Sequence, residues 1–400
     1  MKKSTLYAAA PIPAAPEQLP TGPLKDFPKL AAFFEARQPE TPCLAVDTDI
    51  VEAQYKALVA AVPDALCFYA IKANPARPIL DRMVKLGANY DCASLNEILM
   101  VLEAGASPAN VLFGNTIKKA GEIAEAHRHG VMKYACDSLV ELEKIAKNAP
   151  GAKVFCRIIV SNSGAAWPLS KKFGCTEDMA REILRKAPGL GLVPYGISFH
   201  VGSQQMDVTQ WRDPILRAAG LMRELAQEGI RLKALNLGGG FPARYRQPIP
   251  AVEAYGQAIV GALNEAFGEH FWPEVMLEPG RYICGDAGVI QAEVVLISPD
   301  AEDPNKRWVY LDAGKFSGLI EPESIEYRIV TEKDGDPMGP VVIAGPTCDS
   351  VDVLYENAGY ELPLTLAVGD KVYLLSTGAY TTTYSAIAFN GFPPLKDYYV

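Results

Sequence analysis

The stretch Phe68-Tyr69-Ala70-Ile71-Lys72-Ala73-Asn74-Pro75 carries the pattern that decides the fold. Its first four residues are apolar or aromatic and predict a buried strand. The strand ends at Asn74-Pro75, because proline cannot continue a strand ladder. Lys72 therefore lies at a strand end, facing the pocket that the strand helps to build. Burial there would favour a neutral, nucleophilic amine, whereas a lysine that extends back to water is the simpler alternative.

Similar apolar runs recur along the chain, with amphipathic stretches between them. The predicted strands are Leu66–Ile71, Ala88–Cys92, Val111–Gly114, Met132–Cys136, Lys153–Val160, Tyr195–Val201, Ala234–Leu237 and Val275–Glu278. This alternation predicts a (β/α)8 TIM-like barrel, with an open doubly wound sheet as the alternative. The barrel is favoured because polar residues follow nearly every strand, and barrel enzymes build their sites at that face. These residues are Lys72, Asp91, Asn115, Asp137, Arg157, His200, Gly238–Gly240 and Glu278.

After Cys284 the pattern changes to strands without full helices between them, which indicates a separate β domain. These strands are expected at Val289–Ile297, Arg307–Leu311, Val341–Ala344 and Lys371–Ser376. We expect an N-terminal arm or strand at residues 1–39 that joins the β domain, the barrel at 40–283 and the C-terminal β domain at 284–400. Within the arm, prolines interrupt any hydrophobic region of signal-peptide length before Pro20, so a flexible segment is expected there.

Composition narrows the class of protein. The chain has 400 residues and a net charge of −9. An acidic chain without a block of Lys and Arg is not expected to bind nucleic acid or a membrane surface, and no apolar stretch is long enough to span a bilayer. None of the 8 cysteines has CxxC spacing, so we expect no metal site and reduced thiols in a cytoplasmic protein.

Three motifs at strand ends have the chemistry to bind a flat, phosphorylated ring. Gly238–Gly240 would let backbone N–H groups approach an anion, although a turn without a ligand is the alternative. In Glu278-Pro279-Gly280-Arg281, arginine and glycine suit a phosphate, and the carboxylate suits a protonated ring nitrogen. A local ion pair is the alternative there. His200 is the one histidine that follows a barrel strand, so it can lie flat over a ring or remain a hydrogen-bonded core residue.

The β domain offers two further candidates. Cys348 lies in a turn-like polar setting, where a thiol can be reactive, and the adjacent Asp349 has the charge to hold a substrate cation. Tyr380 and the hydroxyls of Thr381–Thr383 have donors for a phosphate. A loop without a role and a strand-edge tyrosine are the respective alternatives.

Together these parts describe a pyridoxal phosphate site. The chain resembles the fold-type-III pyridoxal phosphate decarboxylases, the alanine-racemase-like barrel family, and within it the bacterial ornithine/lysine decarboxylases. The motifs that carry the resemblance are Phe68–Asn74, Asp91-Cys92-Ala93-Ser94, Ser198–Ser203, Gly238–Pro242, Glu278–Tyr282, Cys348-Asp349-Ser350, Gly378-Ala379-Tyr380 and Phe389-Asn390-Gly391-Phe392.

The resemblance implies a role for each matching residue. Lys72 would hold the cofactor as a Schiff base, His200 would stack on its ring, and Glu278 would keep its pyridine nitrogen protonated. Asp91 and Arg157 would order the pocket. Cys348 would protonate the substrate carbon and Asp349 would hold the distal ammonium, both reaching into the partner's barrel in a homodimer. The residues implied around the phosphate are Ser203, Gly239, Gly240, Gly280, Arg281 and Tyr380.

The substrate is the least constrained part of the resemblance. Eukaryotic relatives use a Tyr-Asp pair after the position of Asp312, and the stretch Gly314–Glu323 departs from it. Glu321 or Glu323 is expected to bind the distal amine instead. We expect conversion of L-ornithine to putrescine, in polyamine biosynthesis, with L-lysine to cadaverine as a further activity. A diaminopimelate decarboxylase or amino-acid racemase of the same fold, and a non-catalytic decarboxylase-like binding regulator, are the alternatives.

Overall fold

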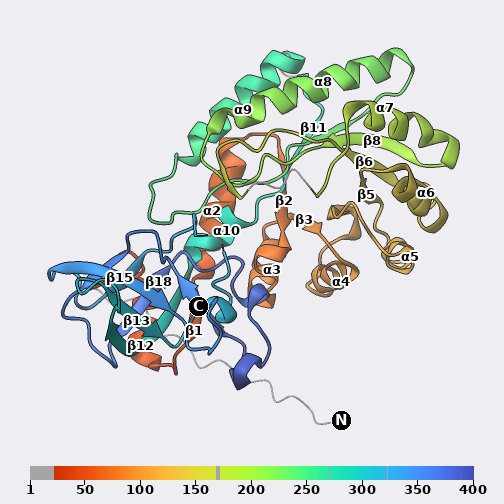
Figure 1. The fold of residues 1–400 in the computed structure, drawn as a ribbon. Coiled ribbons are helices and arrows are strands. Elements are labelled where there is room, and N and C mark those ends of the chain that lie inside the picture. The colour runs from red at the N-terminus through yellow and green to blue at the C-terminus, as the bar shows by residue number, and fades with distance from the viewer. Residues whose placement is uncertain (1–21, 168–171, 270, 322) are drawn as a thin grey trace, which may run out of the picture.

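The computed structural model describes residues 22–400 except 168–171, 270 and 322, and it consists of a barrel beside a β-sheet domain (Figure 1). The barrel is closed and parallel, in the order β10-β11-β2-β3-β4-β5-β6-β8. Its strands are β2 (Leu66–Ala70), β3 (Asn89–Cys92), β4 (Val111–Phe113), β5 (Lys133–Cys136), β6 (Lys153–Arg157), β8 (Val193–Ser198), β10 (Ala234–Asn236) and β11 (Glu274–Leu277). Each lies within a few residues of its predicted range, so the (β/α)8 prediction is confirmed.

Helices pack around the barrel, and their ends follow from local sequence (Figure 1). Ser94 and Ser138 cap two of them by accepting hydrogen bonds from the N–H groups of Glu97 and Glu141, at 3.2 and 3.3 Å. Gly130, at a φ of 88°, follows the end of another, where a left-handed residue favours glycine. The helices are α2 (Thr48–Ala61), α3 (Arg77–Lys85), α4 (Leu95–Glu103), α5 (Ala120–Arg128), α6 (Leu139–Asn148), α7 (Glu177–Lys186), α8 (Arg212–Gln227), α9 (Val252–Phe267) and α10 (Arg281–Cys284).

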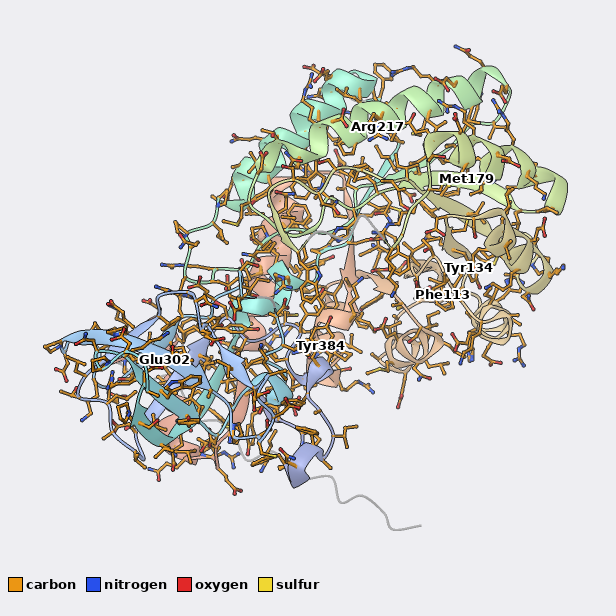
Figure 2. The ribbon with its side chains drawn as sticks, viewed as in Figure 1. Phe113, Tyr134, Met179, Arg217, Glu302 and Tyr384 are labelled. Carbon is orange, nitrogen blue, oxygen red and sulfur yellow. The ribbon has the colours of Figure 1, made fainter. Side chains whose placement is uncertain are left out.

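The barrel interior is a packed core and not a channel. Side chains from its strands fill it, and all are buried: Phe68, Leu112, Phe155, Tyr195, Ala234 and Met276. A larger apolar layer lies between the strands and the surrounding helices. Figure 2 shows Phe113 and Tyr134 in this half of the molecule, and their ring centroids are 6.1 Å apart. Because the interior is filled, a ligand has access to the barrel only at its ends.

The second domain is a nine-stranded sheet with the central order β14-β18-β12-β13-β15-β16. Its strands are β1 (Cys43–Val46), β12 (Gly288–Pro299), β13 (Arg307–Leu311), β14 (Ile329–Thr331), β15 (Met338–Ala344), β16 (Val353–Leu354), β17 (Glu361–Pro363), β18 (Lys371–Leu375) and β19 (Lys396–Tyr399). The four strands expected after Cys284 are all present. β7 (Ala165–Trp167) and β9 (Ser203–Gln205), which follow the barrel strands β6 and β8, form a separate two-stranded antiparallel sheet.

Strand β1 lies inside the range expected for the barrel, yet it belongs to the sheet of the β domain. It pairs antiparallel with β12 and parallel with β19, the last strand of the chain. Helix α1 (Pro28–Arg37) packs on the same domain through Phe33 and Phe34, which contact Tyr398 and Tyr373. We therefore propose that the barrel begins at about Asp47 and not at residue 40. The expected flexible segment before Pro20 lies outside the described residues.

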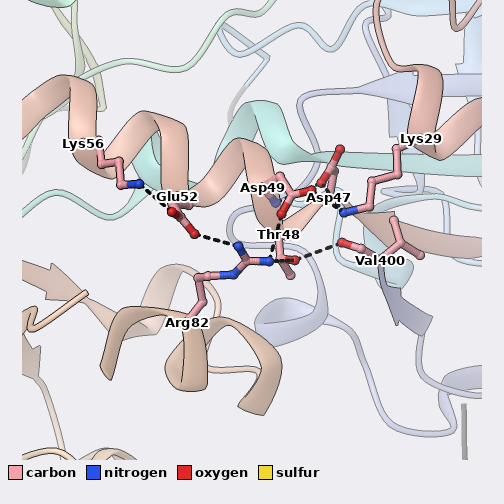
Figure 3. A network of polar contacts seen from close by, with 8 residues as sticks. All are labelled: Lys29, Asp47, Thr48, Asp49, Glu52, Lys56, Arg82 and Val400. Carbon is pink, nitrogen blue, oxygen red and sulfur yellow. Dashed lines mark hydrogen bonds and ion pairs between the residues drawn. The ribbon is translucent and has the colours of Figure 1, made fainter. Parts of the chain in front are cut away.

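A polar network joins the barrel helices to the C-terminal strand (Figure 3). Arg82 of α3 donates to Glu52 at 2.6 Å, to Asp49 at 2.8 Å and to the Thr48 hydroxyl at 3.0 Å. The Thr48 hydroxyl in turn donates to the carbonyl of Val400 at 3.0 Å. This network therefore fixes α2 and α3, which flank the strand before Lys72, against the end of β19. Over the described part of the chain, no helix combines the length and the apolar character needed to cross a membrane.

Candidate active site

A cavity of about 440 Å³ opens at the carboxyl ends of the barrel strands, beside the β domain. It brings together residues as far apart in sequence as Ala70 and Tyr384. The residues predicted for the site that line it are Lys72, Asp91, Arg157, His200, Ser203, Gly240, Glu278, Gly280, Arg281 and Tyr380. All but one of the residues predicted around the ring and the phosphate therefore share one cavity. The exception is Gly239, where a Cβ would collide with the Glu278 carbonyl oxygen and would lie 3.4 Å from Nε2 of His200.

Lys72 lies in a single helical turn (Ile71–Ala73) directly after β2. Its Nζ is 3.4 Å from Oδ2 of Asp91, and the Lys72 side chain is 49% exposed while that of Asp91 is 5% exposed. The expectation that burial makes this amine neutral is therefore wrong. The nearby Asp91 carboxylate outweighs burial and raises the pKa of Lys72 above its ordinary value. The pair fixes the amine at one wall of the cavity.

Gly114, at the end of β4, makes room for that carboxylate. A Cβ at this position would collide with Oδ1 of Asp91. The Gly114 N–H also donates to the Cys92 carbonyl at 2.9 Å, which holds the two strands in register. The absence of a side chain at Gly114 thus permits the position of Asp91, and through it the position of the Lys72 amine.

Glu278 follows β11 and provides the second carboxyl group of the cavity. Its Oε1 accepts a hydrogen bond from Nδ2 of Asn236 at 2.5 Å. Burial, assisted by the negative charge of Asp91, raises the pKa of Glu278 to about 7. The Asn236 hydrogen bond and the positive charges of Lys72 and Arg157 act in the opposite direction. A carboxyl group poised in this way can hold or release a proton at neutral pH.

His200 is held as a neutral ring. Its Nδ1 accepts a hydrogen bond from the Gly202 N–H at 3.0 Å, which places any ring proton on Nε2. Burial lowers the pKa of His200 well below its ordinary value, and the positive charges of Arg157 and Lys72 lower it further. A neutral imidazole with a fixed tautomer is suited to lie against a flat, cationic ring.

Arg281 lies at the centre of a cluster of polar side chains beside the cavity. Its Nε donates to the Ser203 hydroxyl at 3.2 Å, one terminal nitrogen donates to the Tyr245 hydroxyl at 2.7 Å, and the other pairs with Glu321 at 2.8 Å. The guanidinium carbon lies 4.8 Å from the centroid of the Tyr380 ring. Arg281 and Glu321 are both buried, so the cation keeps a fixed orientation beside the cavity.

The residues around Arg281 fit a phosphate group. At Gly240, with a φ of 109°, a Cβ would lie 2.6 Å from the carbonyl oxygen of Gly202. At Gly280 a Cβ would lie 3.2 Å from the Tyr380 hydroxyl, so it would fill the space between main chain and phenol. The guanidinium of Arg281, the hydroxyls of Ser203 and Tyr380 and the main chain at the glycines offer hydrogen-bond donors of the kind that bind a phosphate, while Glu321 pairs with one terminal nitrogen of Arg281.

Besides Gly239, three of the predicted site residues do not line this cavity in the single chain. Cys348 is exposed, and both its N–H and its thiol contact Oδ1 of Asn390, at 3.0 and 3.3 Å. Asp349 accepts the N–H of Val351 at 3.0 Å. Glu323 is exposed and does not line the cavity. The prediction that Glu323 or Glu321 faces the substrate is not supported within one chain, because Glu321 pairs with Arg281.

Sequence reasoning missed several residues that line the same cavity, among them Lys172, Phe173 and Tyr384. Lys172 and Phe173 lie between β7 and α7, in a segment that no apolar strand pattern locates. Arg157 lies over the Phe173 ring at 5.5 Å, and Tyr384 stacks on Tyr380 with centroids 6.0 Å apart. Figure 2 shows Tyr384 where the two domains meet. The four-residue spacing of Tyr380 and Tyr384 was the sequence signal that could have pointed to Tyr384, because it places a second aromatic residue close to one already predicted for the site.

The fold and this cavity define a class: a (β/α)8 barrel with an amine, a carboxyl group and a buried guanidinium gathered in one cavity at the carboxyl ends of its strands. A family model described as "Pyridoxal-dependent decarboxylase, pyridoxal binding domain" matches residues 48–285. The chain belongs to this family. It is a pyridoxal-phosphate-dependent carboxy-lyase with the alanine-racemase-like fold.

Individual relatives agree with the family. The lysine/ornithine decarboxylase of Selenomonas ruminantium is 34% identical over 362 residues, which cover 89% of each chain. A crystal structure of SrLDC in complex with PLP and cadaverine has a TM-score of 0.82 at 32% identity and covers 92% of each chain. A lysine/ornithine decarboxylase from Vibrio vulnificus, complexed with putrescine, has a TM-score of 0.79 at 29% identity, with 93% of this chain and 97% of that chain covered. Decarboxylation of basic amino acids is the activity that these relatives share.

Proposed function

We propose that this enzyme decarboxylates L-ornithine to putrescine, and L-lysine to cadaverine as a second reaction. The observation that carries the proposal is the joint presence, in one cavity, of the Lys72–Asp91 pair, the buried Glu278 carboxyl group and the Arg281 guanidinium. The diamines bound by the two related structures, cadaverine and putrescine, support the choice of substrates. Membership of a decarboxylase family favours this reaction over racemisation.

Each residue of the cavity has a proposed part in that reaction. When bound, pyridoxal phosphate supplies an electron sink that allows carbon dioxide to leave an amino acid joined to it. Lys72 provides the amine that anchors the aldehyde, and Asp91 orients that amine. Glu278 faces the ring nitrogen, and His200 supports the ring from one side. The groups that bind the phosphate are Ser203, Gly239, Gly240, Gly280, Arg281 and Tyr380.

The remaining steps call for groups from a second copy of the chain. We propose a homodimer in which Cys348 returns a proton to the substrate carbon and Asp349 accepts the distal ammonium of the substrate, each in the partner's cavity. The exposed position of Cys348 supports this arrangement. So do apolar side chains on the same domain, since Ile387 is 85% exposed and Val351 is 56% exposed. A second copy would cover this surface.

The test is a comparison of carbon dioxide release from L-ornithine, L-lysine and meso-diaminopimelate, with pyridoxal phosphate added. We expect release from the first two, with ornithine giving the higher kcat/KM. A preference for diaminopimelate, or release from none of the three, would refute the proposed substrate. Borohydride reduction of the loaded enzyme followed by peptide mapping checks the anchor, and the label is expected on Lys72.

A further inference from the structure

Asn236, the last residue of β10, occupies a position between the carboxyl group and the glycine loop of the site. It is 1% exposed. Its Oδ1 accepts the N–H of Gly238 at 2.9 Å, and its Nδ2 donates to Oε1 of Glu278 at 2.5 Å. The main chain of Glu278 is tied to the same loop, because its N–H donates to the carbonyl of Gly238 at 2.8 Å. One amide side chain thus joins two strand ends.

The direction of these hydrogen bonds follows from their partners. A main-chain N–H can only donate, so the amide of Asn236 must present its oxygen to Gly238. Its NH2 group therefore faces Glu278, and Oε1 of Glu278 must accept. If Glu278 carries a proton, that proton belongs on Oε2, the oxygen that Asn236 does not occupy. The Asn236 side chain thereby distinguishes the two oxygens of a buried carboxyl group.

We propose that Asn236 is a positioning residue for Glu278. By donating to Oε1, it stabilises the carboxylate form and directs Oε2 toward the nitrogen of the cofactor ring, while its bond to Gly238 couples that carboxylate to the phosphate-binding loop. This inference rests on the proposed placement of Glu278 opposite the ring nitrogen.

The charges around Glu278 explain why the carboxylate needs a neutral donor. Asp91 disfavours a second negative charge in the cavity, whereas Lys72 and Arg157 favour it. Burial also disfavours the ionised form of Glu278 and raises its pKa, whereas the hydrogen bond from Asn236 favours the ionised form and lowers its pKa. Without that donor, the Glu278 carboxyl group would need a higher pH to ionise. A carboxylate in place of the amide would share a single proton with Glu278, as close carboxyl pairs do.

The experiment measures binding of pyridoxal phosphate to the full-length apoprotein by absorbance between pH 6 and pH 9. For Asn236→Ala we expect affinity about tenfold to a hundredfold weaker at pH 7, since a hydrogen bond to a buried charge is lost. The pH midpoint for tight binding should rise. Asn236→Asp keeps the acceptor for Gly238 and the side-chain shape, so it folds if the alanine variant does not, and its midpoint should rise as well.

Two further variants separate the possible failures. Asn264 carries a comparable amide outside the active-site cavity, and its Oδ1 accepts a hydrogen bond from Nε1 of Trp272 at 3.0 Å. The Asn264→Ala variant should therefore bind the cofactor as the parent does. Glu278→Gln should weaken binding and remove its pH dependence in this range. If Glu278→Gln weakens binding and both Asn236 variants match the parent in affinity and midpoint, the role of Asn236 is wrong while Glu278 keeps its place. If Glu278→Gln also matches the parent, the proposed placement of Glu278 is refuted.

Discussion

At the scale of single residues, the site is built from groups whose charge is set by their neighbours. Glu278 gives a prediction for the apoprotein, because its pKa of about 7 lies above the ordinary value of 4.5. Between these two pH values the folded chain holds a proton that the unfolded chain has released, so stability falls as pH rises. Above pH 7 the loss is complete, at about 3 kcal/mol. Glu278→Gln, which does not titrate, should escape it.

The measurement is the free energy of unfolding of parent and Glu278→Gln apoprotein in urea, at pH 5 and pH 8. From pH 5 to pH 8, the free energy of unfolding of the variant should rise relative to that of the parent by about 2–3 kcal/mol. A difference between the two proteins that is the same at both pH values would contradict the raised pKa.

Lys72 and Glu321 show why residue-level chemistry is only partly predictable from sequence. The position of Lys72 at a strand end follows from its own strand and from Asn74-Pro75. Its charge does not, because it depends on Asp91, which the barrel brings in from the neighbouring strand β3. Glu321 has no local signal at all for its partner, since Arg281 is 40 positions away. Ion pairs of this kind can be identified only from the three-dimensional arrangement of the strands and domains.

At the scale of elements, the turn after β2 is fastened to the β domain through Asn74, which is buried. Its Nδ2 donates to the Gly378 carbonyl at 2.9 Å, and its Oδ1 accepts the Ala76 N–H at 3.1 Å. The Ala73 carbonyl accepts the N–H of Tyr380 at 2.8 Å. These hydrogen bonds therefore hold the turn that carries Lys72 in a fixed position relative to the loop that carries Tyr380.

Removing this fastening should cost stability. Asn74→Ala leaves the buried carbonyl of Gly378 and the part-buried N–H of Ala76 without their partners, and a buried group left unpaired costs about 1–3 kcal/mol. We expect the free energy of unfolding to fall by about 2–4 kcal/mol in urea titrations. Asn264→Ala, which loses a part-buried bond to Trp272, is the matched control and should lose about 1 kcal/mol. Equal losses in the two variants would show that Asn74 has no special part in holding the domains together.

The elements themselves were the most predictable part of this fold. Most barrel strands are short, mainly apolar runs with a polar residue or glycine at or just after their end, and this pattern can be recognised from the local sequence alone. Strand β1 is the exception, because Cys43–Val46 reads as apolar on both faces and does not show which sheet it joins. Its partners β12 and β19 lie about 245 and 350 positions further on. Such non-local pairing leaves no trace in a local pattern.

At the scale of the whole molecule, the residues proposed to act in catalysis lie on two surfaces of the chain. One is the cavity around Lys72, and the other is the exposed surface around Cys348, which includes Asp349 and Asn390. These surfaces do not meet in one chain, so the proposed homodimer is the arrangement that brings them together. Its consequence is that each complete site needs an intact Lys72 from one subunit and an intact Cys348 from the other.

Mixing two inactive variants tests this arrangement directly. Lys72→Ala and Cys348→Ala should each have little activity as a pure protein. When equal amounts exchange subunits, half of the dimers are mixed, and each mixed dimer holds one site with both residues intact, so activity should recover to about a quarter of the parent. A site contained within one chain would show no recovery, because every chain in the mixture lacks one of the two groups. Mixing each variant with itself is the control, and sedimentation confirms that the mixed sample is dimeric.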